Sequence, residues 1–203
     1  VGMPGLGLVF GLLPSFYNAL PESNNPVMGL VGSILHTGLL EELCKIVPVL
    51  LYLAVRREAA RPLELVLVGV FSGLGFAAFE NVMYAGRSVE NTFMLTDAQG
   101  ATGLAEGVTT AMIVVLLRSF SLVFAHAIWT GIFSYFIAMA VATGKRFPAL
   151  FLVGWANAAV LHGTYNGMSR IQTTIPAMVV FGSFVLFYAY LTRLRLTVSA
   201  AGQ

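Results

Sequence analysis

The sequence has few charged residues and very little cysteine or aspartate. Only 10% of its 203 residues are Asp, Glu, Lys or Arg, whereas soluble domains contain about 25%. The single cysteine, Cys44, excludes an intrachain disulfide, and the single aspartate, Asp97, excludes a site built on two aspartates. The few Lys and Arg residues form no basic tract, which argues against a nucleic-acid partner. A soluble domain, a disulfide-stabilised domain and a nucleic-acid-binding protein are therefore not expected.

Long apolar runs dominate the chain instead, with 58% hydrophobic residues and a mean hydropathy of +0.84. A membrane-spanning helix needs about 17 to 25 apolar residues, and we predict an all-α, polytopic membrane bundle of about six such helices. The predicted spans are Gly2–Leu20, Val27–Val55, Leu63–Ala85, Ser119–Ala142, Pro148–Met168 and Ile175–Leu191. The polar stretch Ser88–Glu106 is predicted to be an exposed loop, with at most a short surface helix. Residues 1–203 are expected to form one domain, whose first span is truncated at its start.

Basic residues at the ends of the spans predict the orientation of the chain, because Lys and Arg favour cytoplasmic ends. One orientation puts seven of them inside: Arg56, Arg57, Arg61, Lys145, Arg146, Arg193 and Arg195. Three then lie outside: Arg87, Arg118 and Arg170. Both termini are therefore expected to be cytoplasmic.

Ionisable side chains interrupt four of the predicted spans, at Glu41, Glu42, Lys45, Glu80, His126 and His162. A charge at the bilayer centre costs at least about 2.5 to 3.5 kcal/mol, so such residues are functional candidates by default. At a rise of about 1.5 Å per residue, Glu41, His126 and His162 lie about 21 to 24 Å above the cytoplasmic ends of their spans. Glu80 lies at about 26 Å by the same count. All four are therefore expected at one level, in the outer half of a hydrocarbon core about 30 Å thick.

The types of these residues indicate a metal-dependent hydrolytic site. Two imidazoles and one carboxylate can bind Zn²⁺ or another divalent metal and leave one position open for water. We therefore predict Glu80, His126 and His162 as metal ligands, and Glu41 as the general base that takes a proton from that water. Asn166 shares a helix face with His162 and is predicted to donate a hydrogen bond to the oxyanion.

The roles of the neighbouring polar residues follow from helix geometry. Lys45 lies one turn from both Glu41 and Glu42 and is expected to offset the charge of the carboxylate that is not the base. Adjacent side chains point about 100° apart on a helix, so only one glutamate can face the site fully. Glu42 is therefore the alternative base. Thr130 shares a face with His126, which suits a supporting or substrate-contacting role.

Several polar and small residues need no catalytic role. Arg118 precedes His126 by two helical turns and is expected to anchor the outer interface. His36 belongs to no motif and is interpreted as interfacial. Several glycines are expected to be close-packing positions between helices, among them Gly69, Gly73 and Gly75. The charged cluster itself has an alternative interpretation, as a buried ion cluster that only joins two helices.

The motifs and their order resemble those of a known family. They are Glu-Glu-x-x-Lys (Glu41, Glu42, Lys45), Phe-x-x-x-Glu (Phe76, Glu80), a lone histidine (His126) and His-x-x-x-Asn (His162, Asn166). Together they resemble the PrsW family of intramembrane proteases, which is related to the CAAX prenyl endopeptidases and bacteriocin-processing proteases. The resemblance covers the second to fifth predicted spans.

This resemblance implies a metal-dependent endopeptidase in a prokaryotic plasma membrane. For PrsW proper, the implied substrate is a single-span, membrane-bound anti-sigma factor, cut on its extracytoplasmic side. The relatives use the first glutamate of the pair as the base, which favours Glu41. In the CAAX relatives the second motif ends in His instead of Glu80, and the first ends in Arg one position after Lys45. Prenylated substrates are therefore less expected.

Other functions fit the sequence less well. Ser72 lacks the Gly-x-Ser-Gly context of rhomboid proteases, a pair of membrane aspartates is missing, and the His-Glu-x-x-His motif is absent. A small cation or proton transporter could use the same Glu and His residues, but the chain has no inverted repeat. A non-catalytic scaffold of the same fold also stays open, because only activity would distinguish it.

Overall fold

The structure is a computed structural model that describes residues 25–56, 60–144, 146–169, 171 and 174–201. In chain order the elements are α2 (Pro26–Ser33), the π-helical η1 (Ile34–Gly38), α3 (Leu39–Arg56), α4 (Pro62–Gln99), α5 (Ala101–Leu117), the π-helical η3 (Arg118–Leu122), α6 (Val123–Thr143), α7 (Phe147–Ser169) and α8 (Thr174–Ala201). The all-α prediction is thus confirmed for the described part of the chain. The predicted span Gly2–Leu20 lies outside the described residues.

Four described helices are long and apolar enough to cross a membrane. They are Pro62–Gln99, Ala101–Thr143, Phe147–Ser169 and Thr174–Ala200, and they contain the third to sixth predicted spans. The second predicted span is helical, as α2, η1 and α3, but is not among these four. The total of six spans and the cytoplasmic termini stay predictions.

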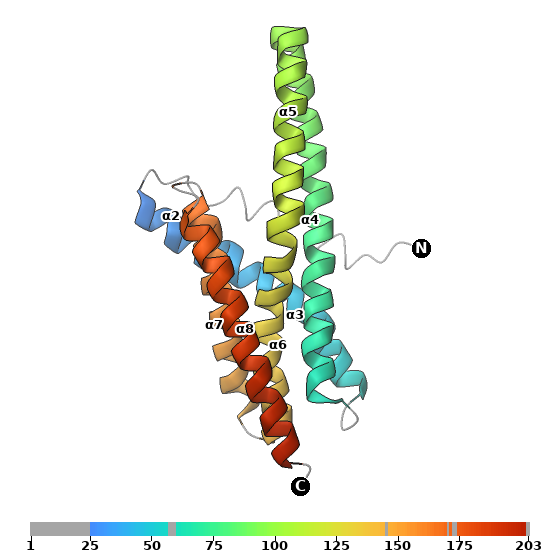
Figure 1. Ribbon diagram of the computed structural model, residues 1–203, viewed down its shortest axis with the longest axis vertical. Coiled ribbons are helices and arrows are strands. Elements are labelled where there is room, and N and C mark those ends of the chain that lie inside the picture. Colours follow the sequence, from blue (N-terminus) through green and yellow to red (C-terminus); the bar gives the residue numbers. More distant parts are fainter. Residues whose placement is uncertain (1–24, 57–59, 145, 170, 172–173, 202–203) are drawn as a thin grey trace.

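The loop predicted at Ser88–Glu106 is wrong, because this segment is a helical hairpin. α4 continues to Gln99, and the chain reverses at Gly100, whose φ of 61° suits glycine. α5 then returns alongside α4, and both extend well beyond the ends of α7 and α8 (Figure 1). The two helices approach closely at Gly107, where a Cβ would lie 2.8 Å from Thr92 Cα. The polar residues of this segment therefore belong to helix surfaces. α4 alone is roughly 57 Å long, well above the roughly 30 Å of a hydrocarbon core.

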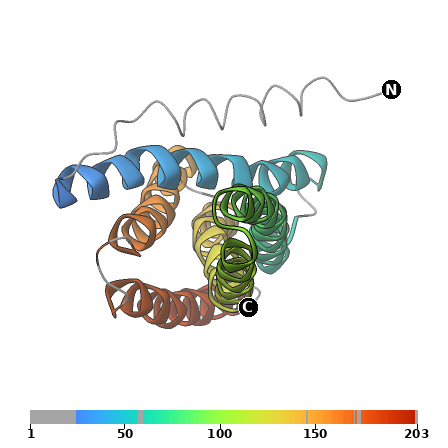
Figure 2. The same cartoon turned by 90° about the horizontal axis from the view of Figure 1, so that it is seen from above.

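α6 is the centre of the bundle. It packs against α3, α4, α7 and α8, and large side chains such as Trp129, Phe133 and Ile137 are fully buried on it. The helix formed by α2, η1 and α3 runs obliquely across the bundle. Seen from above, this helix appears along its length, whereas α4 to α7 appear nearly end-on (Figure 2). This crossing brings the charged motif of α3 against α4, α6 and α7.

Glycine permits close contacts between these helices, as the sequence predicted for Gly69 and Gly73. The same prediction is wrong for Gly75, because a Cβ there would have no neighbouring atom within 4 Å. A Cβ on Gly73 of α4 would lie 2.8 Å from Ala127 Cα on α6, next to His126. A Cβ on Gly163 of α7 would lie 2.7 Å from the backbone nitrogen of Ile34. Real Cβ atoms essentially never come this close, and backbone atoms cannot move aside as a side chain can. Small residues therefore set the distance between the helices that carry the site.

Replacing Gly73 with valine should destabilise the protein strongly. Overpacking typically costs about 1 to 3 kcal/mol, and a clash with the backbone belongs at the upper end of this range. Gly75→Val is the matched control, because Gly75 lies on the same helix and a Cβ there would have no neighbouring atom within 4 Å. Thermal unfolding in detergent should show a clear drop for Gly73→Val alone. Equal unfolding temperatures for the two variants would contradict this account of the helix contact.

Candidate active site

The charged motif lies at the start of α3, where two neighbouring helices hold its backbone. The indole Nε1 of Trp155 on α7 donates a 2.8 Å hydrogen bond to the Leu39 carbonyl. The hydroxyl of Ser72 on α4 donates a 2.5 Å hydrogen bond to the Lys45 carbonyl. These bonds tie both ends of the motif to the bundle, so its side chains project from a fixed backbone.

Glu42 is completely buried and has three polar partners. Its Oε1 lies 2.7 Å from Lys45 Nζ and 2.9 Å from His162 Nδ1, and its Oε2 accepts a 3.1 Å hydrogen bond from Thr130 Oγ1. Glu42 therefore joins α3 to α6 and α7. Thr130, for which a supporting role was expected, thus contacts this carboxylate through its hydroxyl.

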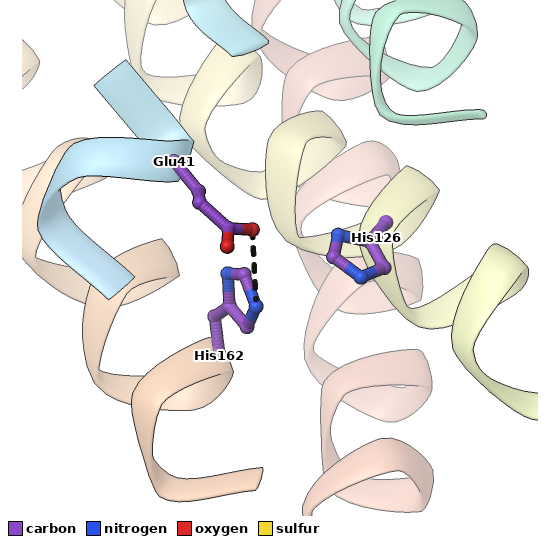
Figure 3. A group of neighbouring side chains, drawn as sticks. All are labelled: Glu41, His126 and His162. Carbon is purple, nitrogen blue, oxygen red and sulfur yellow. Dashed lines mark ion pairs between the residues drawn. The ribbon is translucent and has the colours of Figure 1, made fainter. Parts of the chain in front are cut away.

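Glu41, His126 and His162 come together as a group that could hold a metal ion. One donor atom from each lies within 4.8 Å of the others, and all three side chains are buried. Glu41 points towards the His162 ring, whose Nε2 is 3.6 Å from Glu41 Oε2, and His126 approaches from a third helix (Figure 3). The group therefore combines α3, α6 and α7, which supply one residue each.

Glu80 lies beside this group rather than in it. Its Oε2 is 3.2 Å from His126 Nε2, and its Oε1 is 2.9 Å from the guanidinium of Arg118. The same guanidinium lies over the ring of Tyr84, 3.5 Å from its centroid. The Glu80 side chain is 19% exposed, against 3% for Glu41 and 0% for Glu42. Among the three carboxylates, Glu80 is thus the one nearest to the outside.

Asn166 and Trp129 fix the orientation of His162. Asn166 Nδ2 lies 3.2 Å from His162 Nε2, and the Trp129 ring stacks on the imidazole at 4.8 Å between centroids. The amide NH₂ can only donate, so Nε2 accepts and Nδ1 carries the proton that it donates to Glu42. Asn166 therefore lies beside the site, where its predicted hydrogen bond to an oxyanion could form.

The structure brings together all the residues predicted for the site and adds Arg118 to them. Sequence analysis assigned Arg118 to the outer interface, but it is mostly buried and paired with Glu80. The available signal was a lone arginine inside the apolar run that also contains His126. A charge inside such a run needs a partner, and Glu80 is at a similar depth.

Comparison with known proteins gives the family of the chain. A family model described as PrsW family intramembrane metalloprotease matches residues 1–192. The chain belongs to the PrsW family. It is therefore an integral membrane protein and an intramembrane metalloprotease, which acts on a membrane protein within a lipid bilayer. No curated protein and no solved structure matches the chain significantly.

The residues present fit the metal that membership of the PrsW family implies. The site contains three carboxylates, Glu41, Glu42 and Glu80, but only two cationic side chains, Lys45 and Arg118, so one negative charge is left over. The group of Glu41, His126 and His162 also supplies one carboxylate and two imidazoles, a donor set that divalent metals accept. Surplus negative charge and this donor set both favour a bound cation.

Proposed function

We propose that this PrsW-family protease uses Zn²⁺ to hydrolyse a peptide bond in a single-span, anti-sigma-factor-like protein of a prokaryotic plasma membrane. The observation that supports this best is the buried group of Glu41, His126 and His162, with the carboxylate of Glu80 next to it. The expected single domain, residues 1–203, would contain the whole site. A divalent ion in this group would supply Lewis acidity for the reacting water and the peptide carbonyl.

We assign the ligand positions to Glu41, His126 and His162, and the general base to Glu80. A base must reach water, and Glu80 is the least buried carboxylate of the site. Arg118 holds one Glu80 oxygen at 2.9 Å and leaves the other to face His126. This assignment exchanges the roles that the sequence predicted for Glu41 and Glu80.

Glu42 and Asn166 would support the reaction from either side of His162. Glu42 accepts from Nδ1 of His162, which leaves the Nε2 lone pair directed into the site. A carboxylate in this position orients a ligating histidine and raises its basicity. Asn166 lies at the edge of the site, where its amide can donate to the oxyanion of the cleaved bond. In this assignment Glu42 orients a ligand and is not the base.

Cleavage is proposed to occur near the extracytoplasmic face. α4 begins beside Arg61, at the predicted cytoplasmic boundary, and Glu80 lies 18 residues after Pro62, or about 27 Å along the helix. The hydrocarbon core is about 30 Å thick, so the site lies in its outer part. A helical substrate keeps its carbonyls hydrogen-bonded, so the segment to be cut must unwind before it reaches Glu80.

A pair of conservative substitutions tests the assignment. Glu41→Gln should lose both bound Zn²⁺ and cleavage, whereas Glu80→Gln should keep the metal and lose cleavage by at least about 100-fold, the usual contribution of a general base. Metal content is measured on purified protein in detergent, and cleavage on single-span peptides, with and without a chelator.

The reverse pattern would restore the assignment predicted from sequence, with Glu80 as the ligand and Glu41 as the base. Glu90→Gln is the matched control, because Glu90 is an exposed residue of the same helix as Glu80. Cleavage that survives the chelator but neither glutamine substitution would leave a protease without a metal. A parent protein that cuts no peptide under any condition would overturn the proposed function.

A further inference from the structure

The ammonium group of Lys45 lies inside the candidate metal group. Its Nζ is 2.7 Å from His126 Nδ1 and 2.7 Å from Glu42 Oε1. It is also 3.4 Å from both Glu41 Oε2 and His162 Nδ1. The side chain is fully buried, so these contacts replace all of its water. A cation of the chain itself thus contacts all three residues of the group, on the Nδ1 side of both histidine rings. On His162 it lies next to the Nε2 atom that would bind the metal rather than on that atom.

We propose that Lys45 occupies the metal position when no metal is bound, and that the ammonium and the metal exclude each other. This inference rests on the proposed metal site. Lys45 would then be a positioning residue with two effects. Without metal, it neutralises the carboxylates of the site and keeps the site residues together, and for the same reason it weakens metal binding.

The size of the group supports this exclusion. Its donor atoms are spread over 4.8 Å, whereas donors about 2.1 Å from a tetrahedral ion lie only about 3.4 Å apart. An ammonium makes hydrogen bonds of about 2.7 to 3.0 Å, so a group arranged around one is wider. The contacts of Lys45 with His126 and Glu42 have this hydrogen-bond length. The spacing therefore matches the ammonium better than a metal ion.

The protonation of the two histidines gives a second, independent argument. An ammonium only donates, so the contact with Lys45 makes His126 Nδ1 an acceptor and puts the ring proton on Nε2. His162 is in the opposite form, because its Nδ1 donates to Glu42 and its Nε2 is left with the lone pair. His162 is thus ready to bind a metal through Nε2. His126 can offer Nδ1 to a metal only after Lys45 leaves this nitrogen. Glu42 and the Phe76 ring, 4.3 Å from Nζ, are contacts that Lys45 can keep.

Substitution of Lys45 by methionine tests the inference through metal affinity. Lys45→Met removes the ammonium but keeps most of the side-chain volume. We expect Zn²⁺ to bind this variant at least about tenfold more tightly than the parent, since like charges within about 4 Å repel strongly at buried positions. Affinity is measured in detergent by competition with a chromophoric chelator, with Zn²⁺ alone and no substrate. Lys45→Gln provides a second neutral variant if Lys45→Met does not fold.

Arg118→Met is the matched control for charge. It also removes one positive charge next to the site, but Arg118 contacts Glu80 and lies outside the metal group. We expect its Zn²⁺ affinity to change by less than about threefold, because the guanidinium contacts Glu80 rather than the metal group and Coulomb energy falls with distance. If both variants bind Zn²⁺ more tightly than the parent by the same factor, the cause is the general loss of positive charge. The inference that the metal displaces Lys45 would then be wrong. Weaker binding by Lys45→Met would show that the lysine assists the metal, and would overturn the inference as well.

Thermal unfolding provides a further measurement. Without metal, Lys45→Met should unfold at a lower temperature than the parent, because the carboxylates around it then lose their central cation. Saturating Zn²⁺ should raise the unfolding temperature of the variant by more than that of the parent, since a tighter ligand stabilises more at the same concentration. If the parent binds Zn²⁺ and the variant binds it no better, the inference fails alone. If neither protein binds Zn²⁺, the proposed metal site fails together with it.

Discussion

Substitution of His162 by alanine should abolish metal binding and proteolysis together. His162 contacts four other site residues: Glu41, Glu42, Lys45 and Asn166. Its loss removes an imidazole from the metal group and leaves Glu42 without one of its donors. Lewis-acid catalysis is worth several kcal/mol, so kcat/KM for a cleaved single-span peptide should fall by about 10³-fold or more. Bound metal is measured in the same preparations, and a chelator added to the parent should reproduce the loss.

His36→Ala is the control for this substitution. His36 lies in η1, shortly before the charged motif, and belongs neither to the metal group nor to a predicted catalytic set. This variant should retain both metal and activity. If His162→Ala keeps its metal and still cleaves the peptide, the group of Glu41, His126 and His162 is not the active site.

Replacement of Glu42 by alanine should have the largest effect on stability. Glu42 is fully buried between Lys45, His162 and Thr130, and its removal would leave a buried ammonium without its nearest carboxylate. Breaking a buried ion pair on one side typically costs about 3 to 5 kcal/mol. The unfolding temperature of the purified protein in detergent should therefore fall sharply, and the variant should accumulate poorly in membranes.

Two milder substitutions serve as comparisons for Glu42→Ala. Thr130→Val removes only one of the hydrogen bonds to Glu42, and the loss should be about 1 kcal/mol. Arg61→Ala breaks the ion pair with Glu64 from its largely exposed side, so the unfolding temperature should hardly change. If all three variants unfold alike, the Glu42 cluster does not stabilise the bundle.

The proximity of four site residues could be predicted from the sequence, because it follows from counting residues along the spans. Each span gives a distance from its charged end, and a rise of about 1.5 Å per residue places Glu41, Glu80, His126 and His162 together. The structure brings these four side chains together. Motif order also identified the family correctly. Counting along the helices was sufficient for the first result and motif order for the second, because neither requires knowledge of how the helices are rotated.

The contacts within the site could not be predicted in this way. Depth does not specify which face of a helix meets which neighbour, so it could not show that Glu80 pairs with Arg118 while Glu41 meets His162. The position of Lys45 between two histidines depends on the oblique path of α3. The helical hairpin was missed for another reason. Its polar residues resemble a loop, but helical packing through Gly107 overrides that signal.

The distribution of the site along the chain determines when it can form during synthesis. Glu41, Glu80, His126 and His162 come from α3, α4, α6 and α7, in that order from the N-terminus. A nascent chain that has inserted α3 and α4 already carries all three carboxylates of the site but neither histidine of the metal group. On the proposed assignment, the protease cannot act until α7 has entered the bundle, and a chain that ends before His162 has no activity. Until then the three carboxylates lack the histidine partners that they have in the complete bundle.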